Sequence, residues 1–259
     1  MNSYRTMIID SHIHCGKGLT YETIIPFLKK ADIEGACLFA PVEEVYDRYD
    51  LDFQDTQEWQ LRRKEANEYL LEIARANQGI FPYLFVWNDF DCDELSLGYK
   101  GVKWHRHEGE PVYNYTDKRC QQLIERIVEL NLPIVFEESY SNTLNFINNL
   151  AYEAIVIIPH LGWLNGGFSV LDASGIWKKE TVYADSSLAS SYEIKMFLRK
   201  YGFDKLLFGS DFPFSLPESE LQKILSLDLS EVDQEKIVGG NILRLLGLWG
   251  CSTWNIQEN

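Results

Sequence analysis

The feature that most constrains the fold of this chain is the alternation of short apolar runs with helical patterns. The runs are rich in β-branched and aromatic residues, and they cover residues 6–14, 35–42, 80–87, 99–106, 133–139, 154–162, 181–187 and 205–213. The segments with apolar residues at positions i, i+3, i+4 and i+7 are 19–32, 58–77, 117–131, 142–151 and 191–202. Strands that are apolar on both faces and are joined by crossover helices form a parallel sheet covered by helices.

The number and spacing of these strands favour a closed barrel over an open, doubly wound sheet. Eight strands fall within about 210 residues, with no linker and no break in composition. A chain of 259 residues with 46% apolar residues can bury one large core. We therefore predict an α/β protein with a (β/α)8 TIM-barrel fold, in which residues 1–259 form a single domain. The acidic and aromatic segment 43–57 is expected to form a rim or lid.

Charge and cysteine content exclude several classes of protein. The formal net charge of −15 disfavours nucleic acid and anionic membranes as partners, because their phosphate groups would be repelled. The five cysteines are scattered and form no C-x-x-C pair, which predicts reduced thiols in a cytoplasmic protein. The sequence contains neither a secretory signal pattern nor an apolar run long enough to span a membrane. We expect a small molecule as the partner.

Polar residues with useful chemistry are concentrated where the predicted strands end. In strand order, this set consists of His12, His14, His105, His107, Glu137, His160, Asp185 and Asp211. It includes all five histidines of the chain. In a (β/α)8 barrel the C-terminal ends of the strands meet at one mouth, where catalysis takes place. We therefore expect these side chains to converge.

The motif His12-x-His14 is the strongest indication of a metal site. Residues i and i+2 of a strand share one face and lie about 6–7 Å apart, so both imidazoles would project into the mouth. An isolated pair of this kind could equally be two histidines satisfied by hydrogen bonds. With His160 and Asp211 at the same mouth, a metal site is favoured, and Asp10 is expected to close the barrel or support the ligands.

Six segments of the sequence resemble the amidohydrolase superfamily, and specifically its amidohydrolase-2 branch, which includes aminocarboxymuconate-semialdehyde decarboxylase and related hydrolases. They read IIDSHIH, GVKWH, LPIVFEES, IIPHLGW, LLFGSDFP and VGGNILRLLGL. The resemblance covers nearly the whole chain, and the motifs follow one another in the expected order. The combination of D-x-H-x-H with G-S-D-F-P is its specific part. Barrels of this branch often pair through their outer helices, which implies a homodimer.

The resemblance implies a metal-dependent hydrolase that acts on a small carboxylate, lactone or amide through a metal-activated water. The implied metal ligands are His12, His14, Glu137, His160 and Asp211. Asp211 would also take a proton from the water, and His160 would bind metal or orient the water. The implied cofactor is one divalent ion, with zinc ahead of manganese or iron, and a second ion is left open. Glu137 stands where the family has a histidine, so the site would be harder and more anionic.

Lys103, His105 and Arg106 are predicted to contact the substrate, with His107 at the rim. For Lys103 the alternative is an ion pair with a carboxylate of the barrel.

Three other functions are alternatives to hydrolysis. The first is a metal-dependent decarboxylase of a conjugated carboxylic acid, which would share scaffold and metal. The second is a non-catalytic barrel with a decayed metal site, for which Glu137 is the only support. The third, a TatD-type nuclease, is disfavoured because its glutamate motif is absent from residues 99–105. Neither G-x-S-x-G nor G-x-G-x-x-G occurs in a suitable context, which argues against a serine hydrolase and a nicotinamide enzyme.

Overall fold

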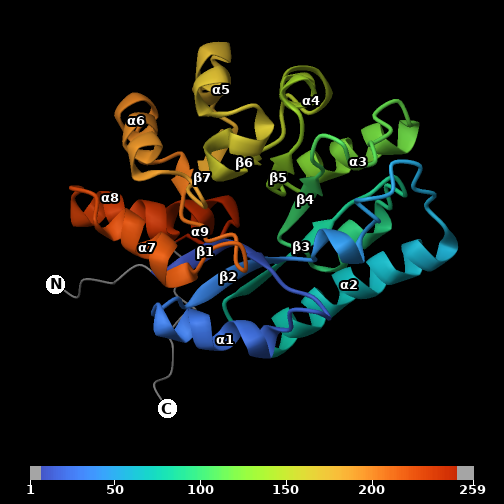
Figure 1. The fold of residues 1–259 in the computed structure, drawn as a ribbon, viewed down its shortest axis with the longest axis horizontal. Helices are drawn as coiled ribbons and strands as arrows, with labels where there is room; N and C mark the ends of the chain where they lie inside the picture. Colours follow the sequence, from blue (N-terminus) through green and yellow to red (C-terminus); the bar gives the residue numbers. More distant parts are fainter. Residues whose placement is uncertain (1–6, 250–259) are drawn as a thin grey trace.

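One sheet of eight parallel strands, paired in the order of the chain, forms the centre of the molecule in the computed structural model, which describes residues 7–249. Helices surround the strands on the outside (Figure 1). The strands are β1 (Ile9–His14), β2 (Gly35–Phe39), β3 (Ile80–Phe85), β4 (Gly101–His105), β5 (Ile134–Glu137), β6 (Val156–Ile158), β7 (Val182–Asp185) and β8 (Leu206–Leu207). This confirms the predicted (β/α)8 barrel. The assignment of residues 1–259 to a single domain stays a prediction.

The barrel closes between β1 and β8, although β8 is only two residues long. The amide of Ser11 donates to the carbonyl of Phe208 at 2.9 Å, and the amide of Asp211 donates to the carbonyl of His12 at 2.7 Å. The carboxylate of Asp10 reinforces this seam, because its Oδ1 accepts from the amides of His12 at 3.1 Å and of Ser210 at 2.9 Å. Asp10 therefore closes the barrel, as the sequence predicts.

The helices cover the outer face of the sheet. They are α1 (Tyr21–Lys30), α2 (Gln57–Ala76), α3 (Lys118–Glu129), α4 (Tyr140–Asn145), α5 (Phe168–Ser174), α6 (Ser191–Tyr201), α7 (Pro217–Leu225), α8 (Glu231–Glu235) and α9 (Asn241–Leu245). The periodicity in α3 predicts an apolar face of Leu123, Ile127 and Leu130 with Ile124 and Val128 beside them. Leu123, Ile124 and Ile127 are buried, whereas Leu130 follows the end of the helix and is 36% exposed. Between β3 and β4 there is only a short 3₁₀ turn, Asp93–Leu97. None of the described helices is long and apolar enough to cross a bilayer.

The C-terminal part of the described chain blocks one end of the barrel. Ile242, Leu243 and Leu245 of α9 are buried in one cluster with side chains of the strands, among them Ile9 and Tyr83. Burying an aliphatic side chain of this size contributes about 1.5–3 kcal/mol, so α9 is a structural element. The opposite end, where the strands have their C-termini, is left for the site.

Candidate active site

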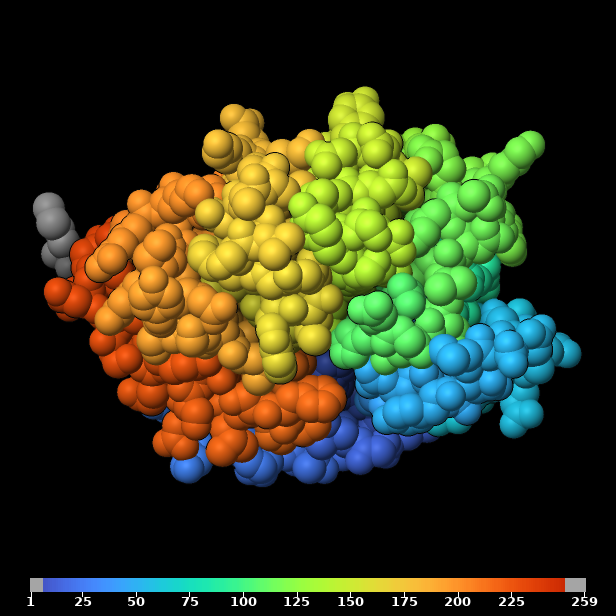
Figure 2. All heavy atoms as spheres, turned by 45° about the horizontal axis from the view of Figure 1, so that its top comes forward, coloured from blue at the N-terminus to red at the C-terminus, as the bar shows by residue number. Residues whose placement is uncertain are grey.

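The C-terminal ends of the strands open into a cavity of about 990 Å³. Figure 2 shows a hollow bordered by the light-blue segment around residues 43–57, the green segment after β4 and the orange segment after β8. The polar lining includes His14, His105, His107, Glu137, His160 and Asp211. The apolar lining includes Leu19, Val42, Trp163, Leu164, Pro213 and Phe214. His12 is fully buried and contacts Asp211, so all five histidines gather at one mouth, as predicted.

The imidazole of His12 has a defined tautomer. Its Nδ1 lies 2.8 Å from Oδ2 of Asp185, and a carboxylate can only accept, so Nδ1 carries a proton. The ammonium of Lys103 lies 3.2 Å from Nε2 and can only donate, so Nε2 offers a lone pair. Burial, followed by the charge of Lys103, lowers the pKa of His12, which keeps the ring neutral. A neutral imidazole with its second nitrogen on a carboxylate is the form that ligates metals.

Asp185, at the end of β7, is the group that orients the histidines. Besides His12 it accepts from the amide of His160 at 3.0 Å and from the amide of Ser187 at 3.0 Å. Burial alone would raise the pKa of Asp185, but the contacts with His12, His160 and Ser187 outweigh it and lower the pKa to about 2. The sequence predicts Asp185 at the mouth but gives no indication of this supporting role.

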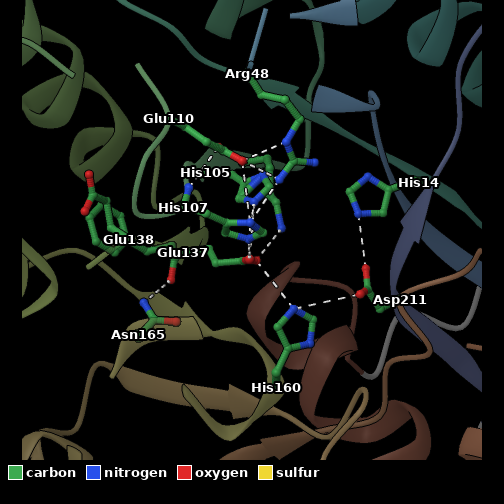
Figure 3. A network of polar contacts seen from close by, with 12 residues as sticks. His14, Arg48, His105, His107, Glu110, Glu137, Glu138, His160, Asn165 and Asp211 are labelled. Carbon is green, nitrogen blue, oxygen red and sulfur yellow. Dashed lines mark hydrogen bonds and ion pairs between the residues drawn. The ribbon is translucent and has the colours of Figure 1, made fainter. Parts of the chain in front are cut away.

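His160 enters the mouth through a left-handed backbone turn after β6. His160 has φ 56° and Leu161 φ 49°, which costs about 1–3 kcal/mol each for a non-glycine residue and is common at functional sites. Nδ1 of His160 lies 3.2 Å from the carbonyl oxygen and 2.9 Å from Oγ of Ser187, so Nδ1 carries a proton. Nε2 therefore faces the mouth, 3.5 Å from Glu137 and 3.9 Å from Asp211 (Figure 3).

The carboxylate of Asp211 contacts the imidazoles of both His12 and His14. Its Oδ1 lies 3.1 Å from Nε2 of His14 and 3.3 Å from Nε2 of His12. Ligand atoms of His12, His160 and Asp211 all lie within 4.8 Å of one another. Nε2 of His12 and Oδ1 of Asp211 both offer lone pairs and lie 3.3 Å apart, so a cation in place of the Lys103 contact could be bound by both atoms. The residues therefore fit a divalent metal ion.

The charge on His160 agrees with this fit. Burial alone would lower the pKa of His160, but the hydrogen bond and the charge of Glu137 outweigh it and raise the pKa to about 9. Without a metal, the protonated ring thus supplies positive charge between two carboxylates, which is what a metal ion would supply there.

Glu137, the residue that departs from the family pattern, is buried at the centre of the site. Its Oε1 lies 2.5 Å from Nε2 of His107 and 3.2 Å from Nε2 of His105. Its Oε2 lies 3.4 Å from the ammonium of Lys103 and 3.5 Å from His160. Burial alone would raise the pKa of Glu137, but His105 and Lys103 hold it well below its usual range. Glu137 is therefore an anion with four partners.

The sequence as a whole matches one known family. The family model of the amidohydrolases of the amidohydrolase-2 type matches residues 9–248. The chain belongs to the amidohydrolase family. Members of this family are metal-dependent enzymes, which confirms both the resemblance and the prediction of an enzyme.

Solved structures agree with the fold of this amidohydrolase. A 2,6-dihydroxybenzoate decarboxylase from Rhizobium has a TM-score of 0.73 at 14% identity, over 94% of this chain and 99% of that chain. A 5-carboxyvanillate decarboxylase from Novosphingobium aromaticivorans, solved with manganese and 4-hydroxy-3-methoxy-5-nitrobenzoic acid, has a TM-score of 0.73 at 15% identity, over 94% and 96%. A protein from Pseudomonas putida, assigned as a 2-pyrone-4,6-dicarboxylic acid hydrolase, has a TM-score of 0.70 at 18% identity, over 95% and 99%.

Of the three residues predicted to bind substrate, one lines the cavity and two form ion pairs with buried carboxylates. His105 lines the cavity. Lys103 is fully buried and pairs with Glu137, which is the alternative that the sequence left open. Arg106 requires a correction, because it is not among the cavity-lining residues and its guanidinium pairs with Glu138 at 2.8 Å. The physical reason is strand alternation: Arg106 follows His105 directly and therefore points to the opposite face.

The rim of the mouth contains a pair that the sequence does not reveal. Arg48, in the predicted rim segment, donates from Nε to Oε1 of Glu110 at 2.7 Å and from a terminal nitrogen to Nδ1 of His107 at 2.9 Å. Tyr46 donates to Oε2 of Glu110 at 2.7 Å. Nothing in the sequence around Glu110 indicates that it pairs with Arg48 and Tyr46, because these contacts join two loops that are distant in the chain.

Asp10 makes the stability of the amidohydrolase depend on pH. Burial raises the pKa of Asp10 from 3.8 to about 7, and its Oδ2 has no hydrogen-bond partner among the described residues. A raised pKa in the folded state means that Asp10 stabilises the fold below about pH 4 and loses this contribution as the pH rises through 7. In the Asp10→Asn variant, which keeps an Oδ1 acceptor, this dependence should be absent.

Urea unfolding of metal-free protein between pH 5 and pH 8 measures the difference. The wild type should lose stability relative to Asp10→Asn by up to about 1.4 kcal/mol per pH unit between the two pKa values. Parallel pH profiles for the two proteins would contradict the assignment.

Proposed function

We propose that this amidohydrolase is a metal-dependent decarboxylase, which replaces the carboxyl group of a conjugated or aromatic carboxylic acid by a proton. The observation that carries the proposal is the cluster of His12, His160 and Asp211 at the floor of a cavity with apolar walls. Such a cavity suits a flat, apolar ring whose carboxylate reaches the floor. The similarity to decarboxylases of aromatic acids supports the same conclusion.

His12, His14, His160 and Asp211 would hold the ion, with Glu137 as a further carboxylate at its side. When bound, the divalent ion supplies the positive charge that fixes the substrate and draws electrons from the bond that breaks. Imidazoles combined with carboxylates suit both zinc and manganese. Manganese is present in two of the similar decarboxylases, and we therefore propose manganese ahead of zinc.

Asp211 is the residue to which we assign the proton transfer. Its Oδ1 is taken up by His12 and His14, whereas its Oδ2 has only His160 at 3.9 Å and belongs to the cavity lining. A proton taken up from solvent at Oδ2 could therefore pass to the substrate carbon as its bond to the carboxyl group breaks and carbon dioxide leaves. Burial alone would raise the pKa of Asp211, but the contacts with His12 and His14 outweigh it and lower the pKa, so this proton has to be supplied anew for each turnover. Trp163 and Phe214, both largely exposed at the mouth, would cover the ring and exclude water from this step.

Removal of the metal tests the proposal. Chelator-treated protein should lose at least about 100-fold in kcat, and manganese or zinc should restore it, because the ion carries the charge stabilisation. Carbon dioxide release is measured with 2,6-dihydroxybenzoate, 5-carboxyvanillate and 2-pyrone-4,6-dicarboxylate. Release that is unaffected by chelation, or no release from any conjugated acid, would sink the decarboxylase assignment.

Hydrolysis of a small carboxylate, lactone or amide is the second candidate. It is supported by the likeness to the Pseudomonas putida protein, and Asp211 would then accept the proton of a metal-activated water. Opening of the 2-pyrone ring without carbon dioxide release identifies this activity in the same assay. A non-catalytic barrel with a decayed metal site is disfavoured. Glu137 is the only support for it, and this carboxylate still contacts four polar side chains at the mouth.

A further inference from the structure

The carboxylate of Glu137 faces two separate groups of side chains. Oε2 faces Lys103 and His160, on the side of the proposed metal site. Oε1 faces His105 and His107, on the side of the rim (Figure 3). The register of the sheet imposes this arrangement, because His105 of β4 pairs directly with Glu137 of β5.

The group on the rim side has the composition of a metal site. Ligand atoms of His105, His107 and Glu137 lie within 4.8 Å of one another, and the two Nε2 atoms are only 2.9 Å apart. None of these residues belongs to the cluster of His12, His160 and Asp211. Two imidazoles and one carboxylate with an open side towards a cavity are a common ligand set for divalent transition metals.

The protons in this group mark the position of a cation. Arg48 can only donate, so its contact of 2.9 Å leaves Nδ1 of His107 as an acceptor and the proton of a neutral ring on Nε2. That single proton is shared between Oε1 of Glu137 at 2.5 Å and Nε2 of His105 at 2.9 Å. Three atoms that could ligate a metal thus surround one hydrogen.

We propose that His105, His107 and Glu137 form a second binding site for a divalent transition-metal ion, beside the site at Asp211. The ion replaces the shared proton, and Glu137 then bridges the two sites through its two oxygens. The inference extends the proposed metal-dependent activity from one ion to two. Lys103 does not block the second site, because its ammonium contacts Oε2 and not Oε1.

Glu110 is placed to give His107 a supporting hydrogen bond once Arg48 has moved away. A histidine that ligates through Nε2 donates its Nδ1 proton to an acceptor, most often a carboxylate. Oε1 of Glu110 lies 3.6 Å from Nδ1 of His107, and Oε2 accepts from the amide of His107 at 2.9 Å. Arg48 has to give way in the loaded state. Its guanidinium is at the end of a long side chain and lines the cavity, so it has room to move.

Metal content per chain tests the proposal without reference to activity. The complete chain is treated with chelator, reloaded with manganese or zinc chloride, desalted and analysed by plasma mass spectrometry. We expect two ions per chain in the wild type, and one in both His107→Gln and His160→Ala. Glu43→Gln, which removes a half-exposed carboxylate at the mouth outside both groups, should keep two. In manganese-loaded protein, electron paramagnetic resonance should show spin coupling that His107→Gln abolishes.

The outcomes separate this inference from the proposed function. One ion per chain that His107→Gln keeps and His160→Ala loses would overturn the second site and leave the first intact. One ion that His107→Gln loses and His160→Ala keeps would overturn the first site and support the second. Binding of neither metal would overturn both.

Discussion

Replacing Asp211 by asparagine should lower kcat by about 10²–10⁴-fold, which is the usual contribution of a positioned proton-transfer group. Asparagine has the shape of aspartate and keeps one oxygen for His12 and His14, but it can neither hold nor deliver a proton. Asp211 is 5% exposed and lines the cavity, so its carboxylate is held at the floor where the substrate would react. The rate is measured with the substrate found in the carbon dioxide assay.

Metal content must be measured on the same preparation, because loss of the ion would also abolish turnover. Asp228→Asn is the matched control: it makes the same chemical change at an exposed position between α7 and α8, and its kcat should equal that of the wild type. A metal-loaded Asp211→Asn protein with full activity would show that proton transfer occurs elsewhere.

Replacing Gly101 by alanine should lower the free energy of unfolding by about 1–3 kcal/mol, the range for overpacking of a core. Gly101 begins β4, and its register partner on β3 is Tyr83. A Cβ atom at this position would lie 2.1 Å from Cε1 of the Tyr83 ring. The ring is fully buried and packs edge-on against Phe39 with centroids 5.0 Å apart, so it has little room to move.

Urea unfolding compares this variant with Gly18→Ala, at which no atom lies within 4 Å of the added Cβ. Gly18→Ala should unfold with nearly the free energy of the wild type. Equal stability of the two variants would mean that the barrel interior accommodates a methyl group beside Tyr83. A double variant with Tyr83→Leu should recover part of the loss, because it removes the ring that the methyl group meets.

The sequence predicts the strands well where they run straight and poorly where they end. The predicted sixth and eighth strands extend to residues 162 and 213, whereas β6 and β8 end at Ile158 and Leu207. Beyond these points His160 and Asp211 have positive φ angles. Such angles in non-glycine residues are held by tertiary contacts, here the carboxylate of Asp185 and the carbonyl of His12. A hydrophobic pattern carries no information about them.

The sequence predicts the position of a site residue well when that residue lies on a strand. Strand alternation places His12 and His14 together, and the same alternation turns Arg106 away from the cavity, towards Glu138. Glu110 meets its partners through loop packing, which no local pattern encodes. Helices α5, α7 and α8 lie outside the segments for which the periodicity predicts a helix. All the assigned roles at the site stay predictions, as do the cytoplasmic location and the homodimer. They are the metal-ligand roles of His12, His14, Glu137, His160 and Asp211 and the catalytic roles of His160 and Asp211.

The seam of the barrel has a consequence for how the protein is made. His14 and Asp211, which share a contact at 3.1 Å, are 197 positions apart in the chain. The first histidines leave the ribosome long before the aspartate that completes their site. A nascent or truncated chain that stops before the eighth strand holds no assembled centre, whatever it has already folded. Activity that depends on both residues therefore begins only with a nearly finished polypeptide.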